Sequence, residues 1–253
     1  VKTEADPRER LRGLGAEVRE QFARNQRVMT FEEYFSLLCR EPVRQARSAA
    51  QYLRDVFDHF GTERVRHPSG AITRYRLFDC PFDGGRGRLI GQEDVQNRFY
   101  RAIGGFVREG RTNRLILLHG PNGSAKSTFV ECLARALEHF SMLDDGALYR
   151  FNWVFPSEKL GRAGIGFGGG RHDGGSADSY AALGDDLVDA RLRCELRDPP
   201  LFLLPPARRR EILEEHLAAA GAKDFVLSEY VLRGELCHKC KPIQEALLTT
   251  YQG

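Results

Sequence analysis

The chain has 253 residues, 42% of them hydrophobic and 29% charged, with 38 lysine and arginine side chains against 35 acidic ones. This is the composition of an ordinary globular protein, and a net charge of only +3 argues against one that mainly coats nucleic acid or an anionic membrane. The apolar runs LILL and LFLL are far shorter than the roughly 20 residues that cross a bilayer. We therefore expect neither a membrane nor a nucleic acid as partner.

The six cysteines are spread along a chain that is long enough to build its own core, which favours a reduced, cytoplasmic compartment over a disulfide scaffold. The first residues, VKTEADPRERLRG, contain no apolar segment of the kind that secretory signals need. The chain starts with valine and stops without an obvious terminal element, so we expect it to be part of a longer protein.

Residues 1–60 are predicted to form a helical lead-in. Apolar residues three or four positions apart in LRGLGAEVREQF predict a first helix. Thr30 followed by Glu33 is a capping box, which predicts the start of a second helix. Pro42 is predicted to begin one continuous third helix, and Gly61 is predicted to end it.

Residues 61–253 are predicted to form a nucleotide-binding domain. Short strands and turns are expected at 62–90, a helix after Gly91, a strand at 114–120, a helix after the loop that follows, and a strand with alternating apolar residues at 147–155. A strand, a helix and a strand in succession are the βαβ pattern, so we predict an α/β fold of P-loop NTPase type, a parallel sheet flanked by helices. A glycine-rich loop is expected next, followed by helices at 179–196, 205–221 and 241–252.

The loop GPNGSAKST is nearly the phosphate-binding signature G-x-x-x-x-G-K-[ST]. Such a loop turns backbone N–H groups toward phosphate oxygens and leads into a helix N-terminus. Lys126 is expected to reach the β- and γ-phosphates, and the hydroxyl of Ser127 to bind Mg²⁺. The alternative is a chance match in a turn that is rich in glycine and serine. The predicted nucleotide-binding residues are Gly120, Pro121, Asn122, Gly123, Ser124, Ala125, Lys126, Ser127 and Thr128.

Ala125 stands where the signature has its second glycine. The residue before the lysine lies where the chain enters the helix, so we expect Ala125 to have a negative φ, at which a methyl group is tolerated. We expect Gly123 to hold the positive φ that the turn needs. On this basis Ala125→Gly should leave nucleotide affinity roughly unchanged, whereas Gly123→Val should abolish it.

Cys237 and Cys240 have the C-x-x-C spacing of zinc ligands, and Cys194 is a possible third ligand. A fourth would be Cys80, His238 or a residue that the pattern does not reveal. The alternative interpretation is two cysteines that merely lie near each other at a helix end. The spacing alone does not decide between these interpretations.

Two further sets of polar residues have a functional and a structural interpretation. The arginines at 208–210 could contact phosphates, but the acidic residues beside them favour a solvated helix face. His172 and Asp173 could be catalytic, but their glycine-rich surroundings favour a solvated loop.

An ATPase of this type also needs an apolar strand that ends in acidic residues, which hold Mg²⁺ and orient the attacking water. No such strand is apparent after the loop, because SMLDD is too short and LGDDLVD is expected to be helical. The H-R-D and D-F-G signatures of ordinary protein kinases are also missing. Catalytic residues therefore stay unassigned.

Five segments taken together, GQEDVQNRFYRAI, LLHGPNGSAKST, ALYRFNWVFPSEK, CELRDPPLFLLP and EALLTTYQG, resemble the N-terminal AAA region of the PrkA family in order and spacing. That family consists of bacterial proteins described as serine protein kinases. The resemblance runs from Phe31 to the end of the chain, and alanine in the loop is usual there. It implies an AAA+ type ATP-binding domain with ATP and Mg²⁺ as ligands, a protein substrate and a homo-oligomeric assembly.

In that family the acidic strand and the region credited with kinase activity come later in the chain, so the resemblance implies kinase activity only for a longer parent protein. The pair of cysteines departs from the family pattern. Two alternatives stay open. One is an AAA+ ATPase for remodelling or for a protease, without true kinase activity, and the other is a module in which nucleotide acts only as a signal.

Overall fold

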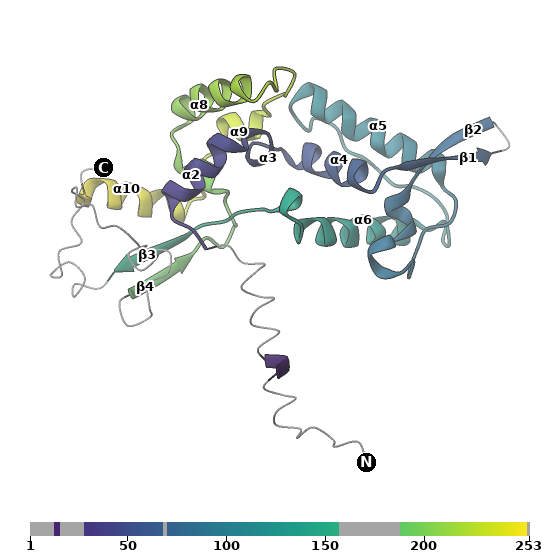
Figure 1. Ribbon diagram of the computed structural model, residues 1–253, viewed down its shortest axis with the longest axis horizontal. Coiled ribbons are helices and arrows are strands. Elements are labelled where there is room, and N and C mark those ends of the chain that lie inside the picture. The colour runs from purple at the N-terminus through teal and green to yellow at the C-terminus, as the bar shows by residue number, and fades with distance from the viewer. Residues whose placement is uncertain (1–12, 16–27, 68–69, 157–187, 252–253) are drawn as a thin grey trace, which may run out of the picture. The chain divides into compact units, whose positions relative to one another are not determined.

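The computed structural model describes residues 13–15, 28–67, 70–156 and 188–251 (Figure 1). It divides into two compact units: the described parts of 1–34 and 153–192, and of 35–152 and 193–253. The elements are α2 (Phe31–Arg40), α3 (Pro42–Gln45), α4 (Ala49–Phe60), β1 (Thr62–His67), β2 (Gly70–Tyr75), η1 (Arg76–Asp79), η2 (Pro81–Asp83), α5 (Glu93–Glu109), α6 (Lys126–Ser141), η3 (Asp144–Gly146), β3 (Asn152–Pro156), β4 (Val188–Arg193), η6 (Pro200–Leu203), α8 (Pro206–Ala219), α9 (Glu229–Arg233) and α10 (Cys240–Tyr251).

The capping box that opens α2 is confirmed. The Glu33 carboxylate accepts a hydrogen bond from the Thr30 backbone N–H at 2.7 Å, and the Glu33 N–H donates to the Thr30 hydroxyl at 3.2 Å. The predicted third helix is wrong in one respect, because it is two helices. The short α3 ends before Ser48, which forms a second capping box and starts α4.

The predicted parallel sheet is wrong. The described residues contain only two sheets of two strands each, β1 with β2 and β3 with β4, and β1 pairs with β2 in antiparallel register. The segment 114–120, predicted as the strand before the loop, forms neither helix nor strand and has no strand partner within the described ranges. Leu115 and Leu117 are accordingly 87% and 76% exposed. A βαβ unit exists only where both strands bond to one sheet, and here β3 pairs with β4 instead.

Other predictions from the sequence have mixed outcomes. The short strands expected after residue 62 form the β1–β2 hairpin, and the helices expected at 205–221 and 241–252 are α8 and α10. The helix expected at 179–196 is wrong for residues 188–193, which form β4. Most of the first predicted helix, and the loop with His172 and Asp173, lie outside the described residues.

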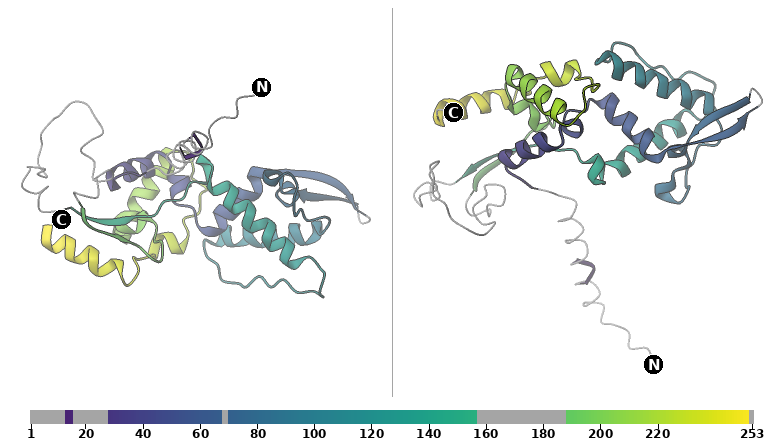
Figure 2. Two further views of the ribbon diagram at one scale, coloured as in Figure 1. Left: turned by 90° about the horizontal axis from the view of Figure 1, so that it is seen from below. Right: turned by 45° about the horizontal axis from the view of Figure 1, so that its top comes forward.

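The larger unit is built around α4, which packs between α5 and α6 (Figures 1 and 2). Aromatic side chains fill this core, with Phe57 of α4 in ring contact with Phe78 and Phe99, and Phe129 of α6 stacked on Phe78. A second cluster joins α3, α8 and α9 through Ala46, Leu213 and Val231. The first of these cores fixes α6, which begins at the candidate loop.

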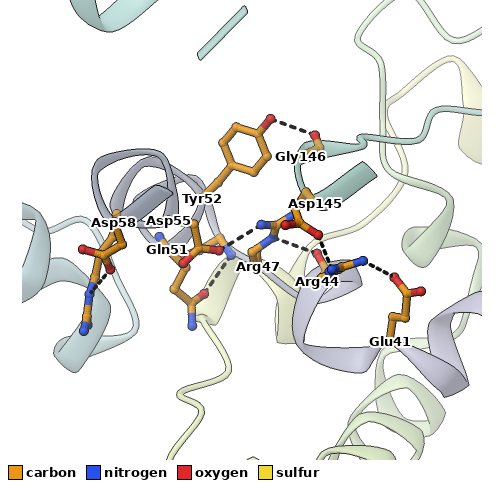
Figure 3. A network of polar contacts seen from close by, with 11 residues as sticks. Glu41, Arg44, Arg47, Gln51, Tyr52, Asp55, Asp58, Asp145 and Gly146 are labelled. Carbon is orange, nitrogen blue, oxygen red and sulfur yellow. Dashed lines mark hydrogen bonds and ion pairs between the residues drawn. The ribbon is translucent and has the colours of Figure 1, made fainter. Parts of the chain in front are cut away.

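A network of polar contacts holds η3, the short helix that follows α6, against α4 and the residues before it (Figure 3). The Tyr52 hydroxyl donates a buried hydrogen bond of 2.8 Å to the carbonyl oxygen of Gly146. Arg47, which is almost completely buried, bonds to the Asp55 carboxylate at 2.9 Å and to the Asp145 carbonyl at 2.8 Å. A Cβ on Gly146 would lie 1.9 Å from the carbonyl oxygen of Phe140, so only glycine fits there.

Candidate functional site

The loop before α6 contains two residues in the left-handed backbone region. Gly123 has φ +80°, as predicted. Ala125 has φ +60° and ψ +23°, so the expectation of a negative φ is wrong. This conformation brings a Cβ close to the following carbonyl oxygen, at a cost of about 1–2 kcal/mol. The signature has glycine at this position for the same reason, and the chain folds with alanine there despite the cost.

Gly120 has a different role from Gly123. Its φ is not positive, but a Cβ at this position would lie 2.8 Å from the hydroxyl oxygen of Ser124. The chain forms a turn here, in which the Ser124 N–H donates a hydrogen bond of 3.3 Å to the carbonyl oxygen of Pro121. Gly120 is therefore needed for a close approach, whereas Gly123 is needed for its backbone angle.

Lys126, the first residue of α6, closes the loop on itself. Its ammonium group donates hydrogen bonds to the carbonyl oxygens of Gly120 at 2.9 Å and Pro121 at 2.7 Å, and to the hydroxyl of Ser124 at 3.2 Å. The charge that the sequence predicts for phosphate binding thus lies within the turn of the loop. An ammonium held by carbonyl oxygens can exchange these acceptors for an anion that reaches it, because hydrogen bonds to an anionic acceptor are stronger.

The N-terminus of α6 offers backbone donors. The first intrahelical bond runs from the N–H of Phe129 to the carbonyl of Ala125 at 2.9 Å. Ala125 has no side chain that could cap the helix, and within the described residues the N–H groups of Lys126, Ser127 and Thr128 have no hydrogen-bond acceptor. Unpaired N–H groups at a helix start carry partial positive charge and favour an anion.

Ser127 is exposed at this helix start, and within the described residues its hydroxyl makes no hydrogen bond. A hydroxyl oxygen is a hard ligand of the type that Mg²⁺ prefers. Pro121 and Asn122 are also exposed, at the outer side of the turn. Six of the nine predicted residues therefore form the loop and the last three form the start of α6, with Gly120, Ser124 and Lys126 in mutual contact.

The segment after Leu89, which holds the first of the five segments that resemble the PrkA family, packs on the same core as the loop. Leu89 is buried with Phe129, and Ala125 packs against this cluster. Gln96, whose role the sequence did not reveal, is completely buried and fastens the segment. Its side chain accepts from the N–H of Tyr75 at 3.0 Å and donates to the Gly91 carbonyl at 3.1 Å.

The arginines at 208–210 do not act as one group. Arg208 and Arg210 are exposed and pair with Glu211 and Glu214 on the same helix, as expected of a solvated face. Arg209 contradicts that expectation, because it is completely buried. Its guanidinium donates to three backbone carbonyls, which belong to the residue after η6, to α9 and to the residue after α9, and burial lowers its pKa.

Five of the six cysteines fall into two groups. Cys194, Cys237 and Cys240 lie together, as the spacing suggested, and Asp198 joins them. Cys80 is not the fourth member, since its sulfur lies 3.5 Å from that of Cys132 in the core around α4. His238 is exposed and is not part of the group. Asp198 was missed because a single aspartate gives no periodic or spacing signal, although the following PP dipeptide marks a turn.

A surface hollow of about 740 Å³ lies in the larger unit, away from the loop. It is lined by residues of α4, α5 and α9, among them Phe106, Arg111, Tyr230 and Arg233, and by none of residues 120–128. Of the nine residues 120–128, four are exposed, five are half-buried and none is buried.

Among the described residues, no helix has both the length and the apolar character that a membrane crossing requires. A comparison with protein-family models, with curated proteins and with solved structures found no match to this chain.

Proposed function

We propose that this chain binds ATP with Mg²⁺ through residues 120–128 and is the nucleotide-binding region of a PrkA-like serine protein kinase. The observation that carries the proposal is the position of Lys126. Its ammonium lies inside a turn formed by Gly120 and Ser124, next to three backbone N–H groups that have no acceptor in the described residues. A triphosphate carries several negative charges and many acceptor oxygens. It is therefore matched by a lysine ammonium and a row of backbone N–H donors at one place.

Each residue of the loop would have a separate role in binding ATP and Mg²⁺. Lys126 would exchange its bonds to the loop carbonyls for bonds to phosphate oxygens, and the N–H groups at the start of α6 would bind the same phosphates. Ser127 would hold Mg²⁺ through its hydroxyl, with phosphate oxygens and water as the remaining ligands. The Mg²⁺ would neutralise phosphate charge, which lets the nucleotide approach this helix end.

Titration of the purified chain with a fluorescent ATP analogue, followed by competition with unlabelled nucleotides, tests these roles. ATP should displace the analogue, and AMP, which lacks the β- and γ-phosphates, should do so at least tenfold less well. Ser127→Ala should weaken binding in the presence of Mg²⁺ and leave binding in excess EDTA unchanged. Equal competition by ATP and AMP would contradict binding through the phosphates.

A binding module without turnover is the second candidate. It is favoured by one observation: in residues 129–156 and 188–251, no apolar strand ends in the acidic pair that would orient an attacking water. ATP labelled at the γ-phosphate separates the possibilities. Label on protein supports a kinase, free phosphate supports an ATPase, and intact ATP bound to the chain supports the module.

A further inference from the structure

Four side chains that can bind a metal ion come together in the larger unit, far along the chain from the loop. Every pair of their ligand atoms lies within 4.8 Å, and the ligands are Cys194, Asp198, Cys237 and Cys240. Cys194 lies directly after β4, Asp198 lies four residues later, and the C-x-x-C pair lies at the start of α10. Two segments more than thirty residues apart thus meet at one point.

The separation of the sulfur atoms matches a shared metal ion. The Sγ atoms of Cys194 and Cys237 are 3.8 Å apart. Zinc bound to thiolates at about 2.3 Å in a tetrahedron places any two sulfur atoms about 3.8 Å apart. A disulfide would bring them to about 2.05 Å, and the six cysteines of the chain are all thiols. The cluster is therefore spaced for a tetrahedral ion.

The surrounding hydrogen bonds hold the ligands in this arrangement. The N–H of Asp198 donates to the sulfur of Cys194 at 3.3 Å, and the N–H of Cys237 donates to the Asp198 Oδ2 atom at 2.8 Å. The Asp198 carboxylate also interacts with the Cys194 thiol, so both side chains face the same point. The turn of the C-x-x-C pair is closed by a bond from the Cys240 N–H to the Cys237 carbonyl at 3.0 Å. Such outer contacts orient metal ligands.

Burial argues for an ion rather than for a chance cluster. Cys194 and Cys240 are 5% and 2% exposed, and Asp198 is 9% exposed. A carboxylate enclosed with three thiols is costly unless a positive charge compensates it. Closed sites with three thiolates favour Zn²⁺ over Mg²⁺ or Ca²⁺, which prefer oxygen ligands.

We propose that Cys194, Cys237 and Cys240, with Asp198 as the fourth ligand, bind one structural Zn²⁺ ion that fastens the turn at 194–198 to the start of α10. The metal content of the chain, purified with zinc and then dialysed, tests this directly. Elemental analysis should find about one zinc per chain. Cys237→Ser and Cys194→Ser should each lower the zinc affinity at least tenfold, and Cys39→Ser, which changes a cysteine outside the cluster, should leave it unchanged.

Asp198→Asn tests the fourth ligand separately, because the amide oxygen can still accept the bond from Cys237 but lacks the charge. We expect zinc affinity to fall about 10- to 100-fold. Co²⁺ in place of zinc should give the strong visible bands of a tetrahedral thiolate site in the unmodified chain. Asp198→Asn with unchanged affinity would contradict the carboxylate as ligand.

Alkylation of the cysteines in the unmodified chain tests the proposal even if a variant does not fold. With zinc bound, alkylation should spare Cys194, Cys237 and Cys240, and a chelator should make all three react, while labelling of Cys39 stays the same. Labelling of the three that does not depend on the chelator would overturn the proposal. So would a disulfide between Cys194 and Cys237 in a chain that takes up no zinc.

Discussion

The Nζ atom of Lys126 lies 2.9 Å from the carbonyl oxygen of Gly120 and donates a hydrogen bond to it. The lysine that the sequence predicts for phosphate binding thus stabilises the loop from within. Because the loop is already folded, little chain entropy has to be lost when an anion arrives. In the proposed binding of ATP, phosphate oxygens would replace the carbonyl oxygens around the ammonium.

Replacement of Ala125 by glycine should stabilise the chain. Ala125 has φ +60°, where glycine avoids a steric cost that exceeds the extra entropy of glycine in the unfolded state. We expect the free energy of unfolding to rise by up to about 1 kcal/mol. The same change at Ala134, which is exposed within α6, should lower it by about 1 kcal/mol. Urea unfolding measures the free energy of unfolding of both variants. If both substitutions changed it in the same direction, the left-handed conformation of Ala125 would be contradicted.

Gly123 should tolerate asparagine but not valine. No atom lies within 4 Å of a Cβ built at this position, so any effect comes from its φ of +80° and not from a clash. Asparagine adopts this region far more readily than a β-branched residue does. We expect Gly123→Val to abolish ATP binding and Gly123→Asn to weaken it less than tenfold. Similar affinities for the two variants would count against the backbone argument.

The bond between Tyr52 and Gly146 should contribute to stability. Tyr52→Phe leaves the Gly146 carbonyl without its buried donor, which should cost about 1–2 kcal/mol of unfolding free energy. Tyr230→Phe, at an exposed tyrosine, is the control and should change it by less than about 0.5 kcal/mol. If both variants unfold at the same urea concentration as the unmodified chain, the bond from Tyr52 to η3 in Figure 3 does not stabilise the fold.

Alkaline pH should destabilise the core around α4. Burial, and to a smaller extent the neighbouring Tyr100, raise the pKa of Tyr75 to about 12. In the unfolded chain a tyrosine loses its proton near pH 10, so between pH 10 and 12 unfolding releases a proton. The free energy of unfolding should therefore fall as pH rises through this window. Tyr75→Phe should make this fall shallower, which urea unfolding at a series of pH values measures. If the slope of unfolding free energy against pH were unchanged, the raised pKa of Tyr75 would be refuted.

The sequence predicted the features that depend on neighbours in the chain. The capping box of Thr30 and Glu33, the start of α6 at the loop and the positive φ of Gly123 all follow from residue types at short spacing. The loop itself could be recognised for the same reason. The sign of φ at Ala125 was predicted wrongly, because helix propensity was applied to a residue that lies just before the helix.

Features that depend on distant parts of the chain were missed. Two apolar segments with a helix between them look like a parallel pair, but strand pairing is decided by non-local contacts, and the segment with Leu115 found no partner in the described residues. Arg209 appeared to be a surface residue because its burial depends on carbonyls from α9 and from the residue after η6. Asp198 joins the cysteines only through the fold.

Calorimetric titration of the chain with ATP and Mg²⁺, compared between the unmodified chain and Lys126→Ala, tests the central claim most directly. Loss of a charged hydrogen-bond donor to phosphate should cost about 1.5–3 kcal/mol, which is about a ten- to hundredfold loss of affinity. The control, Lys223→Ala, removes an exposed lysine elsewhere and should bind as the unmodified chain does. Equal affinities for the unmodified chain and Lys126→Ala, or no heat of binding from either, would contradict the account.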